Sequence, residues 1–264
     1  MQLIPLPAFA DNYIWLLHTT TEAVVVDPGD AKPVLNWLQQ HPHIQLKAIL
    51  VTHHHADHVG GVAELQAHTL AEVFAPRREC PQLTAHRVED GQTLEWLGHN
   101  WQVLEVPGHT AGHVAYVCQS QPAHLFCGDT LFGAGCGRLF EGTPAQMAHS
   151  LQRLMTLPAN TWVCPAHEYT LSNLAFANAV EPNGPALNQR LQRDRSLREQ
   201  GHPTLPSTLQ READTNPFLR THLPTVQAAA AHWAQSQPNG DPTDTTLAPE
   251  TRCLARLREW KNRF

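Results

Sequence analysis

The sequence lacks any hydrophobic run that approaches the ~20 residues needed for a membrane-spanning helix. It also lacks a basic character, because 18 Lys and Arg residues stand against 24 Asp and Glu residues and give a net charge of −6 at pH 7. An acidic chain is poorly suited to binding nucleic acid over a broad surface. Residues 1–13 contain no Lys or Arg, so we expect no secretory signal. These absences predict no membrane partner and no nucleic-acid partner.

Cysteine is scarce and shows no pattern. The six cysteines form no Cys-x-x-Cys pair and no regular disulfide framework, which is typical of reduced thiols in a cytoplasmic protein. The 264 residues suggest one large domain or two unequal ones, and a chain of this length buries enough surface to fold without disulfides. We therefore expect a cytoplasmic, monomeric protein.

Hydrophobic patterning divides the chain near residue 168. Before that point, short β-branched and apolar runs alternate with amphipathic stretches, which indicates layered α/β packing. The expected strands span residues 13–17, 23–26, 48–51, 103–106, 114–118, 124–127 and 161–164, and the expected helices span 31–40, 58–68 and 144–157. Beyond residue 168 the sequence predicts no strand, only helices at 169–180, 186–200, 223–235 and 250–263. We expect an α/β domain over residues 1–168 and a smaller helical domain over residues 169–264.

Histidine is abundant, with 18 copies, as many as Lys and Arg together. Residues 53–58 have the pattern His-x-His-x-Asp-His and directly follow an expected strand. On an extended chain His53 and His55 point to the same side. The expected turn into a helix at Asp57 directs Asp57 and His58 toward a second point nearby. This one segment can therefore supply ligands to two metal ions.

Three further candidates, His109, Asp129 and His167, each follow an expected strand. Because α/β sheets place ligand sites at the carboxyl ends of strands, we expect these side chains to meet. We predict two divalent metal ions per chain. One is held by His53, His55 and His109, the other by Asp57, His58 and His167, and Asp129 bridges the two. Imidazole and carboxylate ligands without thiolate favour Zn²⁺, with iron or manganese as alternatives.

His54, His113 and Asp27 belong to the same neighbourhood but fill no ligand position. We expect them either to orient the ligands through hydrogen bonds or to pack beside them. Any one of these histidines or aspartates taken alone would more often be a structural residue. The joint pattern at the strand ends carries the metal prediction.

The ligand pattern resembles the metallo-β-lactamase superfamily and, within it, the glyoxalase II family of hydroxyacylglutathione hydrolases. The resemblance runs the whole length of the chain. It includes Asp-Asn-Tyr at 11–13, Gly-Cys-Gly-Arg at 135–138, Asn-Pro-Phe-Leu-Arg at 216–220 and a helical tail ending in Leu-Arg-Glu-Trp-Lys at 257–261. It implies a four-layer αββα metallo-β-lactamase sandwich followed by a smaller C-terminal helical domain.

The resemblance also implies an activity. A member of this family hydrolyses S-D-lactoylglutathione, a 2-hydroxyacyl-glutathione thioester, to glutathione and D-lactate, the second step of methylglyoxal detoxification. A hydroxide that bridges the two metals would attack the thioester. Asp57 and Asp129 would orient this hydroxide.

Four substrate contacts follow from the same resemblance. Arg138 and Tyr169 match residues that hold glutathione, and Arg258 and Lys261 match tail residues that bind its carboxylate end. Phe140 stands where family members often have a tyrosine. The missing hydroxyl predicts somewhat weaker glutathione binding.

Other functions fit parts of the pattern. A glutathione-linked sulfur dioxygenase of the same superfamily uses one iron held by two histidines and an aspartate, and it does not need His58 or His167 as ligands. A β-lactamase would usually have a different ligand set and a secretion signal, and a metal-free scaffold would have lost several ligands. The presence of all seven ligands favours the hydrolase. The basic tail at 249–264 could also be no more than a solvated helix face.

Overall fold

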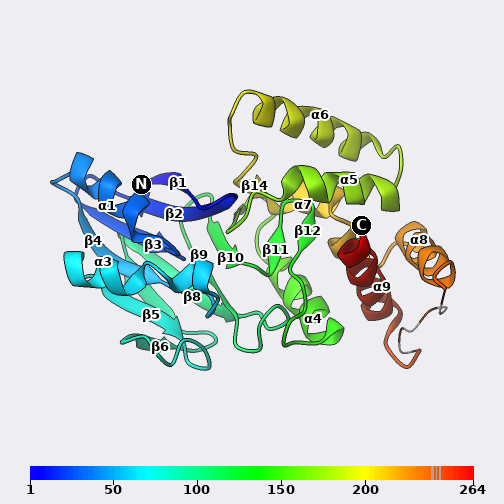
Figure 1. Cartoon of the computed structure of the whole chain (residues 1–264), viewed down its shortest axis with the longest axis horizontal. Coiled ribbons are helices and arrows are strands. Elements are labelled where there is room, and N and C mark those ends of the chain that lie inside the picture. The colour runs from blue at the N-terminus through cyan, green and yellow to red at the C-terminus, as the bar shows by residue number, and fades with distance from the viewer. Residues whose placement is uncertain (239–240, 242, 244) are drawn as a thin grey trace.

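Two six-stranded sheets lie face to face with helices on both outer sides, in a computed structural model that describes residues 1–238, 241, 243 and 245–264 (Figure 1). The first sheet has the order β1-β2-β3-β4-β5-β6 and the second the order β14-β13-β10-β9-β8-β7. The strands of the first sheet are β1 (Gln2–Ala8), β2 (Asn12–His18), β3 (Glu22–Val26), β4 (Gln45–Leu50), β5 (Glu72–Pro76) and β6 (His86–Val88). Those of the second are β7 (Thr93–Trp96), β8 (His99–Glu105), β9 (Val114–Cys118), β10 (His124–Gly128), β13 (Trp162–Pro165) and β14 (Ser207–Thr208). A separate short hairpin consists of β11 (Leu131–Phe132) and β12 (Gly135–Cys136).

The first sheet is antiparallel from β1 to β3 and parallel from β3 to β6. Parallel neighbours need crossover connections. Helix α1 (Ala31–Gln40) lies between β3 and β4, helices α2 (Ala56–Val59) and α3 (Val62–Thr69) lie between β4 and β5, and residues 77–85 connect β5 to β6 without a helix. The single helix expected at 58–68 is wrong, since α2 and α3 are separated at Gly60 and Gly61. The backbone of Gly61 packs so closely that an added Cβ would lie 2.3 Å from the nitrogen of Ala31.

Hydrophobic side chains fill three layers. Trp15, Trp101 and Phe126 are fully buried between the two sheets. Because side chains alternate along a strand, β2 directs Trp15 into this layer and Ile14 into the layer beneath α1 and α3. A third layer joins the second sheet to α4 and α9. The resulting order of helix, sheet, sheet and helix confirms the predicted αββα sandwich.

The C-terminal part is helical, as predicted, with one exception. Helix α4 (Pro144–Leu154) precedes this part. The helices of the C-terminal part are α5 (Thr170–Val180), α6 (Pro185–Glu199), α7 (Leu209–Thr215), the 3-10 helix η1 (Pro217–Leu219), α8 (Pro224–Gln235) and α9 (Pro249–Arg263). The expectation of no strand beyond residue 168 is wrong, because β14 pairs antiparallel with β13. Two residues are too short to produce a hydrophobic period that sequence analysis can detect.

Buried charges connect two of these helices. Arg190 on α6 is 4% exposed and donates to Glu212 on α7 at 2.6 Å.

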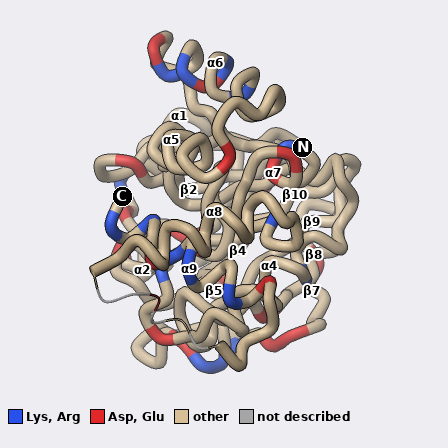
Figure 2. Tube along the Cα trace, turned by 90° about the vertical axis from the view of Figure 1, so that its right-hand side faces the viewer, with Lys and Arg blue, Asp and Glu red and all other residues tan. Residues whose placement is uncertain are grey.

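The last helix, α9, is rich in basic residues, because the segment 249–264 holds five basic and two acidic residues (Figure 2). Among the described helices, none combines the length and hydropathy required to cross a membrane.

Candidate metal centre and adjoining pocket

The histidines and aspartates singled out from the sequence meet at one edge of the paired sheets. His53 and His55 lie in the loop that leaves β4, and Asp57 and His58 lie in α2. The other three follow strands of the second sheet, with His109 beyond β8, Asp129 beyond β10 and His167 beyond β13. Four strand ends and one short helix therefore bring the seven side chains together.

His53, His55 and His109 form what we call the first group, which also contacts Asp129. His55 Nδ1 lies 3.0 Å from His53 Nε2 and 3.1 Å from His109 Nε2, and His109 Nε2 lies 3.4 Å from Asp129 Oδ2. Burial lowers the pKa of all three histidines, and that of His53 falls well below its usual value. The first group therefore consists of neutral imidazoles, which is the protonation state that binds metals.

Asp57, His58 and His167 form the second group. His167 Nε2 lies 3.3 Å from Asp57 Oδ2, and His58 Nε2 lies 3.6 Å from the same oxygen. Asp129 Oδ1 lies 3.4 Å from both His58 Nε2 and His167 Nε2. Asp129 therefore directs one oxygen toward each group.

The pKa values of Asp57, His167 and Asp129 are shifted strongly toward the charged forms of these side chains. The pKa of Asp57 is lowered, mainly by its hydrogen bond with His167. Burial would lower the pKa of His167, but the adjacent carboxylates of Asp129 and Asp57 raise it to about 11. Burial would likewise raise the pKa of Asp129, but His58 and His167 lower it. The carboxylates stay ionised and can neutralise bound cations.

Two buried atoms of the cluster lack the partners that such atoms normally have. His58 Nε2 and Asp129 Oδ1 have no hydrogen-bond partner among the described residues, although buried polar atoms are nearly always satisfied. Ligand atoms about 2.0–2.2 Å from a tetrahedral Zn²⁺ lie about 3.4 Å from one another. The separations given above, 3.0 to 3.6 Å, lie close to this value, and all ligand atoms of each group lie within 4.8 Å of one another. The residues present thus fit divalent metal ions.

Of the three nearby residues expected from the sequence, Asp27 and His113 orient the cluster through hydrogen bonds, and His54 does not. Asp27 accepts from Thr52 Oγ1 at 2.7 Å and from His58 Nδ1 at 3.0 Å. His113 Nε2 accepts from the backbone nitrogen of Asp129 at 3.2 Å. His54 faces away from both groups, toward the carboxylates of Glu79 and Glu141.

Sequence reasoning did not single out Asp11, Asn12, Glu79 or Glu141 as functional residues. Asp11 contacts His167 and Asn12 contacts Asp57. The Asp-Asn-Tyr motif at 11–13 was the one available signal, but it does not indicate which ligands the turn would meet.

A pocket of about 580 Å³ extends from His109 and Asp129 toward the C-terminal helices. All four predicted substrate contacts line it, together with further side chains. The lining includes Phe132, Cys136, Arg138, Phe140, Tyr169, Ser172, Asn173, Arg258, Lys261, Asn262 and Phe264. A molecule that lies in the pocket with one end at the metal-ligand cluster can therefore reach the cationic side chains of Arg138, Arg258 and Lys261.

The two tail cations differ in their surroundings. Arg258 is 7% exposed and donates from Nη1 to the carbonyl of Cys136 at 2.7 Å. Lys261 Nζ donates to the carbonyl and the hydroxyl of Ser172, both at 3.1 Å. Burial, together with Arg258 and Arg138, lowers the pKa of Lys261 to about 8.

Aromatic rings complete the wall near the cluster. The ring of Tyr169 stacks on His167 with centroids 4.7 Å apart. Phe140, which is 62% exposed, presents its ring edge-on to His55 and His109. Both rings border the space in front of the two groups.

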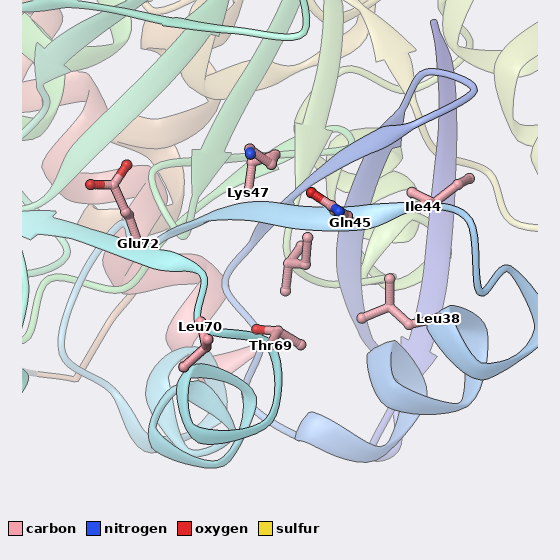
Figure 3. Close-up of a pocket in the computed structure, with 8 residues that line it drawn as sticks. Leu38, Ile44, Gln45, Lys47, Thr69, Leu70 and Glu72 are labelled. Atoms are coloured by element: carbon pink, nitrogen blue, oxygen red, sulfur yellow. The ribbon is translucent and has the colours of Figure 1, made fainter.

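A second hollow, of about 640 Å³, lies at the opposite ends of the strands (Figure 3). Residues at the starts of β4 and β5 line it, together with side chains from α1 and the end of α3. They are Leu38, Ile44, Gln45, Leu46, Lys47, Thr69, Leu70 and Glu72. None of these is a histidine, so the hollow is chemically unlike the pocket beside the metal-ligand cluster.

Comparison with known proteins agrees with the fold and the cluster. Residues 9–167 match the family described as "Metallo-beta-lactamase superfamily", and residues 168–264 match "Hydroxyacylglutathione hydrolase C-terminus". The chain is a metallo-β-lactamase superfamily protein. It is 54% identical to the "Hydroxyacylglutathione hydrolase" of Albidiferax ferrireducens over 100% of both chains. It therefore belongs to the hydroxyacylglutathione hydrolase family, as the sequence motifs predicted.

Solved structures with the same fold include two informative examples. BLEG-1 B3 metallo-beta-lactamase superposes with a TM-score of 0.61 at 26% identity, covering 83% of this chain and 98% of that one. The protein TTHA1623, solved in a di-iron-bound form, superposes with a TM-score of 0.54 at 32% identity. That match covers 62% of this chain and 91% of the other.

Proposed function

We propose that this protein hydrolyses S-D-lactoylglutathione and related 2-hydroxyacyl-glutathione thioesters to glutathione and the free hydroxy acid, D-lactate for the first of these. This reaction is the second step of methylglyoxal detoxification. The observation that carries the proposal is the pocket that joins the metal-ligand cluster to Arg138, Arg258 and Lys261. The name of the Albidiferax relative, which matches along its whole length, supports the same reaction.

We propose two divalent ions per chain as cofactors. His53, His55 and His109 would hold one, Asp57, His58 and His167 would hold the other, and Asp129, which faces both groups, would bridge them. The two groups of converging ligand atoms and the unpartnered atoms of His58 and Asp129 support this assignment. Nitrogen and oxygen ligands suit Zn²⁺, and the di-iron form of TTHA1623 makes iron the main alternative, ahead of manganese.

When bound, such ions supply a hydroxide nucleophile near pH 7 and polarise the thioester carbonyl. Asp57 and Asp129 orient the attacking oxygen through their ionised carboxylates. Hydrolysis would form a C–O bond at the thioester carbonyl carbon and break its C–S bond. The glutathione thiolate leaves unprotonated, since its conjugate acid has a pKa of about 8.5, so no side chain has to donate a proton.

The remaining pocket residues hold the substrate in position. Arg138, Arg258 and Lys261 bind the carboxylates of glutathione, and the ring of Tyr169 on His167 forms the wall beside the thioester. Fixing the thioester in front of the cluster turns a bimolecular encounter into a step within one complex.

We also propose that the chain divides into domains 1–168 and 169–264, that it works as a monomer, and that it is cytoplasmic. The two family matches meet at residues 167 and 168, which supports the division. One chain supplies the whole cluster and the whole pocket, which supports a monomer. Six free, buried cysteines suit a reducing compartment.

Elemental analysis of the purified protein, combined with an assay for S-D-lactoylglutathione hydrolysis, tests the proposal. We expect two metal ions per chain and a hydrolysis activity that a chelator removes. One iron per chain, with oxygen consumption and no thioester hydrolysis, would instead support a dioxygenase. A β-lactam assay serves as the control for the activity of the BLEG-1 relative.

A further inference from the structure

We propose that the turn between β1 and β2, through Asp11 and Asn12, positions the second group and thereby sets how tightly the second metal is held. This inference rests on the proposed metal-dependent function. It concerns two residues that coordinate no metal themselves but contact Asp57 and His167, two of the three residues in the second group.

The backbone first brings the turn to the cluster. The nitrogen of Tyr13 donates to the carbonyl of Ala166 at 2.7 Å, and the nitrogen of Glu168 donates to the carbonyl of Asp11 at 2.8 Å. Asn12 and His167 form an antiparallel bridge between these two hydrogen bonds. The start of β2 is therefore paired with the loop that carries His167, across more than 150 residues of sequence.

Asp11 fixes the ring of His167. His167 Nδ1 donates to Asp11 Oδ1 at 2.7 Å, which leaves Nε2 facing Asp57 and Asp129. A ligand histidine whose other nitrogen donates to a carboxylate is held in one tautomer and one orientation. Asp11 therefore holds the ring in the orientation that directs Nε2 toward the metal position.

Asn12 fixes the carboxylate of Asp57. The side chain of Asn12 is 7% exposed, and its Nδ2 donates to Asp57 Oδ2 at 3.0 Å. Asp57 lies on α2, and within the described part of the chain no backbone hydrogen bond connects α2 to the β1–β2 turn. The amide of Asn12 is thus a direct link between α2 and the turn, and the link requires a hydrogen-bond donor.

The first group has different supports. His53 Nδ1 contacts Thr52 Oγ1 at 3.0 Å, and His109 Nδ1 donates to the carbonyl of Arg138 at 2.8 Å. Neither contact involves the β1–β2 turn. A change in the turn should therefore weaken metal binding in the second group while leaving the first group filled.

Isosteric exchanges provide the sharpest test, because metal binding should stay unchanged at one position and weaken at the other. Asp11→Asn keeps an oxygen that can accept from His167, so metal binding should stay close to that of the unmodified chain. Asn12→Asp keeps the shape but places a carboxylate against Asp57. We expect it to weaken the second metal by about 10- to 100-fold, the usual effect of losing a residue that orients a ligand. Asp11→Ala and Asn12→Ala should produce losses of the same order.

The measurement is equilibrium dialysis of each full-length variant against a competing chelator, followed by elemental analysis. Loading with Mn²⁺ gives a second readout, because electron paramagnetic resonance distinguishes two coupled ions from one isolated ion. We expect about one tightly held, uncoupled ion in Asn12→Asp and two coupled ions in Asp11→Asn. Asp90→Ala is the matched control, since Asp90 is also a turn aspartate that accepts from a backbone nitrogen, that of Glu105 at 2.8 Å, away from the cluster.

A purely structural role for the turn makes a different prediction. Asn12→Asp would then bind metal like the unmodified chain, or lower the melting temperature of the metal-free protein and weaken both metals equally, and either result would overturn the inference. Comparing the metal-free melting temperatures with that of Asp90→Ala separates lost stability from lost positioning. If the unmodified chain binds two metals and hydrolyses the thioester, and Asn12→Asp binds metal equally well, the inference is wrong and the proposed function stands. An unmodified chain that binds no metal contradicts the proposed function as well.

Discussion

Replacing Lys261 with methionine should separate substrate capture from chemistry. Methionine keeps an apolar stem beside the rings of Phe176 and Phe264, which lie 5.5 and 5.4 Å from Nζ, but removes the charge. A hydrogen bond to a charged group contributes about 1.5–3 kcal/mol, which corresponds to about 10- to 150-fold in binding. Because Nζ already donates to Ser172 at 3.1 Å, part of this contribution is lost when substrate competes for it. We therefore expect KM for S-D-lactoylglutathione to rise by about tenfold, near the lower limit.

The assay compares this thioester with a short lactoyl thioester that lacks the glutathione carboxylates. Lys261→Met should hydrolyse the short thioester like the unmodified chain, because the metal ligands are untouched. Arg263→Ala is the matched control on the same helix, since Arg263 pairs with Glu259 and does not line the pocket. Its KM should not change.

The reasoning fails if Lys261→Met has an unchanged KM for the glutathione thioester, or if it loses as much on the short one. Either result would show that Lys261 does not bind the glutathione carboxylates. Arg258 is a poorer probe, although the sequence places it on the same face three residues away. Its guanidinium also holds the carbonyl of Cys136, so Arg258→Ala would disturb the pocket wall in addition to removing a charge.

Four further results are expected. Above pH 8, Lys261 loses its charge because its pKa is about 8, so KM for the glutathione thioester should rise with pH, and Lys261→Arg should remove that rise in a KM–pH profile. Asp129→Ala should lower the metal content of both groups, since Asp129 faces both, and elemental analysis showing two ions would refute the bridge. Phe140→Tyr should lower KM by about 2- to 10-fold, the value of one neutral hydrogen bond, and an equal or higher KM would show that no such contact forms. Glu212→Ala removes one of the two carboxylates that pair with the buried Arg190, Asp194 being the other, and leaves the backbone nitrogen of Ala134 without its acceptor, so denaturant titration should show a loss of about 1–3 kcal/mol with the metal content unchanged.

The parts of the fold with strong local signals could be predicted from the sequence. Helix α1 begins at Ala31 and ends at Gln40, as its spacing indicates, because Asp30 caps its first turn. The strand ends that carry the ligands were predictable because runs of β-branched residues stop where polar side chains begin. The His-x-His-x-Asp-His spacing and the three later positions sufficed to predict which side chains would meet.

Long-range contacts could not be predicted in the same way. The contacts of Asp11 with His167 and of Asn12 with Asp57 depend on how β2 meets the loop beyond β13, and no local pattern encodes that pairing. Glu79 and Glu141, which are the partners of His54, come from loops whose paths depend on tertiary packing. Arg258 and Lys261 both line the pocket, but their spacing in the sequence does not show that the two side chains are unequally buried.

The pairing of β14 with β13 makes the helical part a structural component of the sheet that bears Asp129 and His167. Without residues 207–208, β13 would become an open edge with unpaired backbone groups, and open edges of this kind promote association between chains. A recombinant fragment ending at residue 168 should therefore be prone to aggregation and unsuitable as a minimal catalytic unit. Shuffling segments between members of this family should succeed only when β13 and β14 are taken from the same parent.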